Sequence, residues 1–126
     1  MVPIITAASS HLPQINFQPD GNLLLEGRSI PENVSILFDP LIDFARNLKD
    51  VDVNFKINLE YFNTATSKKL MELLKTIDAN SSIKQILINW HFEEGDEDNA
   101  EMGEIYEENL LRADFRYHEF IEIKKT

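Results

Sequence analysis

The sequence has no cysteine among its 126 residues, which excludes disulfide bonds, thiolate metal sites and cysteine nucleophiles. Its four glycines are scattered, and none forms the G-x-x-x-x-G-K loop that cradles phosphates. Basic residues are few, because 12 Lys and Arg stand against 22 Asp and Glu, for a net charge of -10. Nucleic acids and anionic membranes are bound mainly through Lys and Arg, so neither is an expected partner.

Long apolar runs are also missing. No stretch approaches the roughly 18 apolar residues of a membrane-spanning helix, and the first eight residues lack the basic start of a signal peptide. We therefore expect a cytoplasmic protein. The length and the 43% hydrophobic content are typical of a single globular domain over 1–126, with a loosely ordered segment at 1–10.

Five strands are expected from the apolar pattern. Two apolar stretches flank Asp20 and Gly21, which predicts a hairpin of strands near 12–18 and 22–28. The clearest strand covers 51–62, where apolar residues from Val51 to Tyr61 alternate with polar ones. This alternation indicates one buried and one polar face. The last two strands are predicted near 86–92 and 115–124.

Three helices are expected between these strands. The first contains Leu37, Leu41, Ala45 and Leu48. It starts either with Asp39 as N-cap and Pro40 as first helical residue, or with a turn over 33–38 that kinks into it. The second contains Leu70, Leu73, Leu74 and Ile77, and the third covers 96–111 with a predicted inner stripe of Met102, Ile105 and Leu110 or Leu111.

The predicted element order is β-β-α-β-α-β-α-β. Strands that are separated by helices require crossover connections, which indicates parallel pairing beside the antiparallel hairpin. The prediction is an α/β (α+β) fold with a small mixed five-stranded sheet and three helices mainly on one face.

The connection before the second helix is rich in residues that can cap a helix, namely Asn63, Thr64, Thr66 and Ser67. One interpretation is a capped helix with surplus hydroxyl groups. The other is a phosphorylation site, since free N–H groups and the helix dipole stabilise a phosphate of about -1.5 to -2 charges. Lys68 and Lys69 could pair with that phosphate. Spacing alone leaves both interpretations open.

Four segments together resemble the SiaC family of bacterial regulatory phosphoproteins. They read G-R-S-I-P-E-N at 27–33, E-Y-F-N-T-A-T-S-K at 60–68, N-W-H-F at 89–92 and F-R-Y-H at 115–118. The last departs from the usual F-P-F of the family. The resemblance covers nearly the whole chain, with its segments in the expected order.

The resemblance implies a STAS-like fold, as in anti-sigma-factor antagonists, and a switch protein that is not an enzyme and needs no cofactor. It implies that a dedicated Ser/Thr protein kinase phosphorylates Thr64 and that a PP2C-type phosphatase removes the phosphate. The dephosphorylated form would bind and activate a diguanylate cyclase and so promote cyclic-di-GMP signalling and biofilm formation. The expected kinase or partner contacts are Phe62, Asn63, Thr66, Ser67 and Lys68.

Two other features suggest alternative functions. Nine acids lie between 93 and 108, either as a solvated helix face or as a docking face of a constitutive binding subunit for a basic partner. His91 precedes them and could belong to a small metal-dependent enzyme, but no second imidazole lies at metal-ligand spacing, so no metal site is expected. Phe44, Phe62 and Phe120 fall outside the predicted apolar stripes and could form surface contacts.

Overall fold

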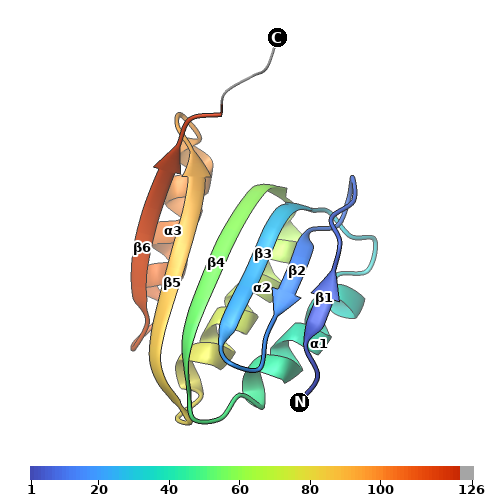
Figure 1. Cartoon of the computed structure of the whole chain (residues 1–126). Helices are drawn as coiled ribbons and strands as arrows, with labels where there is room; N and C mark the ends of the chain where they lie inside the picture. The colour runs from blue at the N-terminus through green and yellow to red at the C-terminus, as the bar shows by residue number, and fades with distance from the viewer. Residues whose placement is uncertain (123–126) are drawn as a thin grey trace.

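The computed structural model describes residues 1–122 and contains one six-stranded sheet and three helices in the described part (Figure 1). The strands lie side by side in chain order and are β1 (Ile4–Thr6), β2 (Gln14–Phe17), β3 (Asn22–Ser29), β4 (Val51–Phe62), β5 (Ile83–Glu93) and β6 (Asp114–Phe120). The helices are α1 (Val34–Arg46), α2 (Thr64–Ala79) and α3 (Glu97–Glu108).

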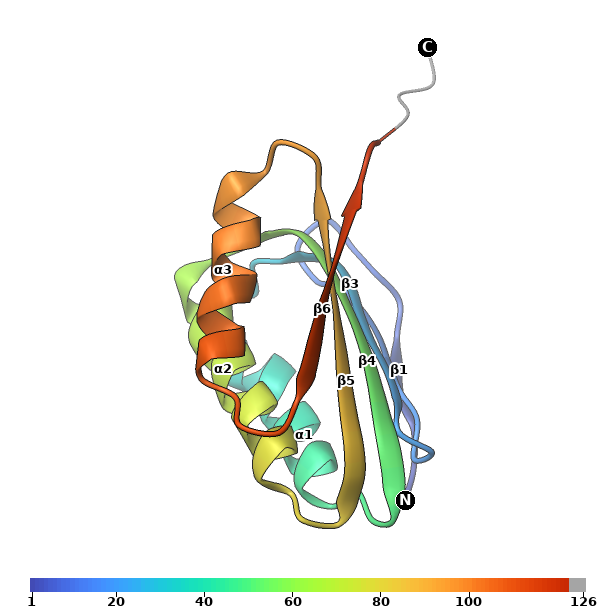
Figure 2. The same cartoon turned by 90° about the vertical axis from the view of Figure 1, so that its left-hand side faces the viewer.

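The sheet is mixed. Strands β1, β2 and β3 pair antiparallel, whereas β3 to β6 pair parallel and are joined through the three helices. Right-handed crossovers that all step in one direction place their helices on one face, and Figure 2 shows all three helices there. The predicted α/β class and the one-sided helical layer are confirmed.

The prediction of five strands is wrong by one. The extra strand, β1, lies in the segment expected to be loosely ordered and pairs with β2, where Ile4 is opposite Phe17. Three residues are too few to show an alternating pattern, so the sequence gives no sign of it. The predicted last strand ends earlier than expected, at Phe120, and its positions 123 and 124 lie outside the described residues.

The core lies between the sheet and the helices and is built largely of side chains that the patterns selected. In β4 the residues Val53, Phe55, Ile57 and Leu59 are buried, as the alternation predicted. The alternation ends at Leu59, because the register shifts there: Gly27 is opposite Leu59, but the next residue of β3 is opposite Tyr61. One extra residue in β4 forms a bulge, which exchanges the faces of the following side chains.

Because of the bulge, two predictions about the side chains of β4 are wrong. Tyr61 was expected on the buried face but is 55% exposed. The guanidinium carbon of Arg28 lies 5.8 Å from the centroid of its ring. Phe62 instead turns toward the core, where its ring meets that of Trp90 edge-on at 6.3 Å. Phe44 is also buried in the core and is not a surface contact.

The start of α1 differs from both predicted alternatives. The N-cap is Asn33, whose side chain accepts hydrogen bonds from the N–H groups of Ser35 and Ile36, and Pro40 lies inside the helix. Pro40 lacks an N–H group but still fits, because the helix gains a cap six residues before the predicted one and a buried face that includes Phe38 and Leu41.

The hydrophobic pattern predicted the packing of helix α3 only in part: Met102 and Leu110 are partly buried against the core, but the fully buried stripe is made of other residues. Its buried residues are Asn99, Gly103 and Tyr106, whereas Ile105 is exposed and Leu111, beyond the helix, is 95% exposed. Gly103 is required by the close approach to Trp90, since a Cβ at this position would lie 2.8 Å from the indole ring. A stripe of amide, glycine and tyrosine carries little hydrophobicity, so apolar periodicity did not find it.

Candidate functional site

The carboxyl ends of β3, β4 and β5 lie at one end of the sheet, where α2 and α3 begin (Figure 2). Between the two helix starts lies a cleft of about 310 Å³, which we call the α2–α3 cleft. The last residues of β4, Glu60 to Phe62, line it together with Asn63, Thr64 and Ser67 from the start of α2 and Asp96, Asp98, Asn99 and Met102 from the start of α3.

Asn63 sets the start of α2. Its backbone is extended, its side chain accepts a hydrogen bond from the N–H of Thr66 at 2.8 Å, and its carbonyl accepts one from the N–H of Ser67. These contacts are those of an N-cap residue. Asn63, expected as a kinase or partner contact, is half-buried and acts as the cap.

Thr66 lies in the interior and has a structural role. The side chain is 0% exposed, and its hydroxyl donates to the carbonyl oxygen of Ser29 at 3.1 Å. Since that proton is used, the Ser29 hydroxyl is the donor in the 2.9 Å bond between the two side chains. The sequence suggested Thr66 as a kinase or partner contact, but it offers no surface to a partner in this conformation.

Thr64 is the exposed hydroxyl at this helix start. It is the first residue of α2, and in the described part of the chain its hydroxyl makes no hydrogen bond. Ser67 differs, because it is half-buried and its hydroxyl donates to the Thr64 carbonyl at 2.7 Å. A phosphate on Thr64 would lie beside the free N–H groups of the first turn.

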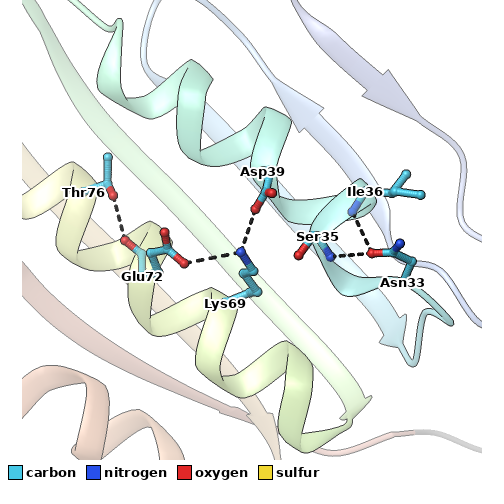
Figure 3. A network of polar contacts seen from close by, with 7 residues as sticks. All are labelled: Asn33, Ser35, Ile36, Asp39, Lys69, Glu72 and Thr76. Atoms are coloured by element: carbon cyan, nitrogen blue, oxygen red, sulfur yellow. Dashed lines mark hydrogen bonds and ion pairs between the residues drawn. The ribbon is translucent and has the colours of Figure 1, made fainter.

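The two lysines that follow have different roles. The Lys69 ammonium lies 2.7 Å from Asp39 of α1 and 3.5 Å from Glu72 of α2, which ties the two helices together (Figure 3). The hydrogen bond to Asp39, more than the neighbouring charges, raises the pKa of Lys69. Lys69 is therefore already paired and is not the expected partner of a phosphate on Thr64. Lys68 is exposed, forms no ion pair within residues 1–122, and lies four residues after Thr64 on the same helix face.

The opposite wall of the α2–α3 cleft is acidic. Asp96 caps α3 by accepting a hydrogen bond from the N–H of Asn99 at 3.1 Å, and Asp98 lies in its first turn. Glu60 adds a third carboxylate from the end of β4. A phosphate on Thr64 would therefore enter a negative field, with Lys68 as the nearby free cation. The single charge of Lys68 would offset only part of a phosphate charge of about -1.5 to -2.

His91, the other residue singled out in the sequence, lies away from this cleft. It stacks on His118 across β5 and β6, with ring centroids 4.5 Å apart, and His118 shares a 2.7 Å hydrogen bond with Asn89. Burial, with the nearby charges of His118 and Lys56, lowers the pKa of His91. Among residues 1–122 no three His, Asp or Glu side chains converge to hold a metal ion.

A larger groove of about 650 Å³ lies at another place, between the N-terminal segment and the start of α1. Its lining is mainly apolar and includes Ile4, Leu12, Ile15, Ile36 and Leu37. Sequence reasoning missed it, because the predicted β2 and α1 supply only part of its walls, and the rest comes from the unpredicted β1 and from connections without periodicity. It contains none of the residues around Thr64, so we retain the smaller cleft as the candidate site.

Comparison with known proteins agrees with the sequence motifs. The family model for SiaC family regulatory phosphoproteins matches residues 6–120. An uncharacterized protein of Pseudomonas aeruginosa strain UCBPP-PA14 is 31% identical over 93 residues, which is 71% of this chain and 74% of that protein. No helix in the described part of the chain is long and apolar enough to cross a membrane.

Two solved structures share the fold. SiaC of Pseudomonas aeruginosa superposes with a TM-score of 0.83 at 22% identity, covering 95% of this chain and all of that chain. A chain in the crystal structure of the diguanylate cyclase SiaD in complex with its activator SiaC, from the same organism, superposes with a TM-score of 0.78 at 24% identity, covering 95% and 100%.

Proposed function

The chain belongs to the SiaC family of regulatory phosphoproteins, and on this basis we propose that it is an adaptor controlled by phosphorylation of Thr64. The family makes it a regulatory protein and not an enzyme. We propose further that the form with unmodified Thr64 binds and activates a diguanylate cyclase in the cytoplasm, and so controls cyclic-di-GMP signalling and biofilm formation. A dedicated Ser/Thr kinase and a PP2C-type phosphatase would set the phosphorylation state.

One observation carries the choice of residue. Of the three hydroxyl groups at the start of α2, that of Thr64 is exposed and free of hydrogen bonds within residues 1–122, whereas Thr66 is buried and Ser67 is engaged by the backbone. A kinase must bring the acceptor oxygen to a phosphoryl group, so an exposed hydroxyl is required. Thr64 meets this requirement without any unfolding of the helix.

The solved relative supports the choice of output partner. Its crystal structure is described as SiaD, a diguanylate cyclase, in complex with its activator SiaC, and it shares the fold of this chain. A target that binds over the α2–α3 cleft would meet a neutral hydroxyl before modification and a dianion beside three carboxylates afterwards. Like charges placed at an interface weaken binding by electrostatic repulsion and by incomplete solvation. The specific likeness to anti-sigma-factor antagonists stays a prediction.

The proposal is tested by mapping phosphorylation on the protein purified from its native host. Phosphate-affinity electrophoresis separates the phosphorylated from the unmodified chain, and mass spectrometry locates the phosphate. The expected result is a phosphopeptide that carries the group on Thr64. Thr64→Ala should abolish the shifted band, while the matched Ser67→Ala should retain it. A phosphate on Ser67 or Thr66, or a shifted band that survives Thr64→Ala, would overturn the assignment.

A further inference from the structure

Strand β6 forms one outer edge of the sheet, and in the described part of the chain no strand lies beyond it (Figure 1). Its residues from Asp114 to Phe120 pair with β5 in an unbroken register, without the bulge that many protected edges contain. They include neither proline nor glycine. The opposite edge, β1, is only three residues long. Strand β6 is therefore the longer edge of the sheet that remains open to pairing.

The backbone of β6 has a row of polar groups that point away from the sheet. The carbonyl of Phe120 accepts a hydrogen bond from the N–H of Glu94, so residue 120 directs its backbone groups toward the β5 side. These directions alternate along a strand in a parallel pair. The N–H and C=O groups of Phe115, Tyr117 and Glu119 therefore face outward. Such a row is a template for one more strand.

The side chains of β6 restrict which segment can pair with this edge. All of them except Phe115 are exposed. On the open face of the sheet, Arg116 and Asp114 form an ion pair at 3.1 Å. On the helical face, the Tyr117 hydroxyl donates to the Glu107 carboxylate of α3 at 2.8 Å. Charged side chains at an edge disfavour pairing with unmatched segments and so select the partner.

The charge beside the edge on the helical face is negative. Burial, the hydrogen bond to Glu107 and the charges of Glu107, Glu104 and Glu108 raise the pKa of Tyr117. A second copy that paired edge to edge about a two-fold axis would have its helices on the same face. It would bring its own three glutamates toward these, with a net charge of -10 on each chain. Repulsion therefore disfavours a second copy, whereas a segment with basic side chains is attracted.

We propose that the outer edge of β6 is a docking site for an extended segment of a partner protein that carries basic side chains. The segment pairs with β6 as a seventh strand and places Lys or Arg side chains beside Glu104 and Glu107. Alternate residues of a strand share a face, so the segment has a basic residue at every second position. No residue of β6 lines the α2–α3 cleft, so this site is separate from the proposed switch at Thr64.

The test is an NMR titration of the full chain, labelled with ¹⁵N, with the peptide acetyl-Thr-Lys-Thr-Lys-Thr-Lys-Thr-amide. The control peptide, acetyl-Lys-Lys-Lys-Thr-Thr-Thr-Thr-amide, has the same charge without the alternation. We expect saturable shifts and slower hydrogen exchange of the Tyr117 and Glu119 amides, and at least about threefold weaker binding of the control peptide. Absence of saturation, or equal binding of both peptides, would overturn the proposal. Shifts of these amides with protein concentration alone would assign the edge to a second copy and also overturn it.

A matched pair of variants tests the backbone pairing. Glu119→Pro removes an outward N–H group and no bond to β5, whereas Glu119→Ala makes the same change of charge and keeps the N–H. The proline variant should bind the alternating peptide at least about tenfold more weakly than the alanine variant. Unchanged amide signals of β4 show that both variants are folded. Equal affinities would contradict the addition of a strand.

A second pair of variants separates this site from general attraction to an acidic protein. Glu104→Gln removes a carboxylate beside the edge and should weaken binding of the alternating peptide by about two- to fourfold. Glu32→Gln removes an exposed carboxylate before α1, at the other side of the sheet, and should leave the affinity unchanged. Equal effects of the two variants would contradict the proposed position of the basic side chains. Neither titration depends on phosphorylation of Thr64.

Discussion

The two ends of α2 differ sharply in how they are attached to the rest of the protein. At the C-terminal end, the Asp78 carboxylate accepts hydrogen bonds from three backbone N–H groups of residues 111–113, each at 2.8 or 2.9 Å. The Asn80 side chain donates to the carbonyls of Ala45 in the last turn of α1 and of Leu48 just after it. At the N-terminal end, the contacts from outside are fewer: Ser29 bonds to Thr66 and accepts from the N–H of Asn63, the Tyr106 hydroxyl donates to the carbonyl of Ser67, and Lys69 pairs with Asp39 one turn into the helix.

Because of this difference, a charged group added at the start of α2 is expected to leave the protein folded. The C-terminal end joins α2 to α1 and to the connection before β6, so a change there affects three elements at once. The first residue of α2 lies outside the contacts that hold the N-terminal end. A charge added at Thr64 therefore alters the surface, while the free energy of unfolding is determined mainly by the core and by the other end of the helix.

The largest effect is expected from Asp78→Ala. The substitution leaves three partly buried N–H groups without their acceptor and should lower the free energy of unfolding by about 3 kcal/mol or more. Asp78→Asn keeps one acceptor oxygen, so it should lower the free energy of unfolding by less than Asp78→Ala does. Urea denaturation followed by Trp90 fluorescence measures both. A loss below about 0.5 kcal/mol for Asp78→Ala would show that the C-terminal end of α2 is not the firm attachment.

The two asparagines at the ends of α2 allow a direct comparison. Asn80→Ala removes two donated bonds and the acceptor for the N–H of Ser82, so a loss of about 2 kcal/mol is expected. Asn63→Ala removes one capping bond and should cost about 1 kcal/mol. The same denaturation experiment gives both values. If Asn63→Ala cost more than Asn80→Ala, the proposed difference between the two ends would be reversed.

Two threonines at the N-terminal end sharpen the comparison. Thr66→Val keeps the shape but loses the bonds to Ser29, and should lower the free energy of unfolding by about 1 kcal/mol. Thr64→Val changes an exposed residue, so its free energy of unfolding should stay within about 0.5 kcal/mol of that of the parent protein. Equal losses for the two variants would mean that Thr64 also holds the helix, which contradicts its assignment as a free switch residue.

A smaller, pH-dependent effect should come from outside α2. Burial, then the charges of His118 and Lys56, lowers the pKa of His91 in the folded protein below the ordinary value of 6.5. Below pH 6.5 the His91 side chain therefore binds protons more readily in the unfolded chain than in the folded protein. The neutral, folded form is fully favoured above that pH, and the free energy of unfolding decreases as the pH falls. His91→Asn should reduce the decrease in the free energy of unfolding between pH 7 and 5, measured by urea denaturation at each pH. If the pH dependence were unchanged in this variant, His91 would not be its cause.

The sequence predicted the helices, the parallel strands and the loop before α2, because each has a periodic or capping pattern of its own. It did not predict the faces of Tyr61 and Phe62, since a single extra residue in β4 leaves no pattern. The difference between Thr64 and Thr66 was also out of reach. It depends on Ser29, which is 37 residues distant from Thr66 and meets it through the pairing of β3 with β4.

The central claim is that a charge at Thr64, and not elsewhere on α2, decides which proteins bind. It is tested most directly by a pull-down from a lysate of the native host, read by mass spectrometry, with Thr64→Ala, Thr64→Asp and Ser81→Asp as baits. Ser81 is exposed at the opposite end of α2, so it adds the same charge at a matched site. We expect a diguanylate cyclase with Thr64→Ala and Ser81→Asp but not with Thr64→Asp. Equal capture by all three baits would contradict the account.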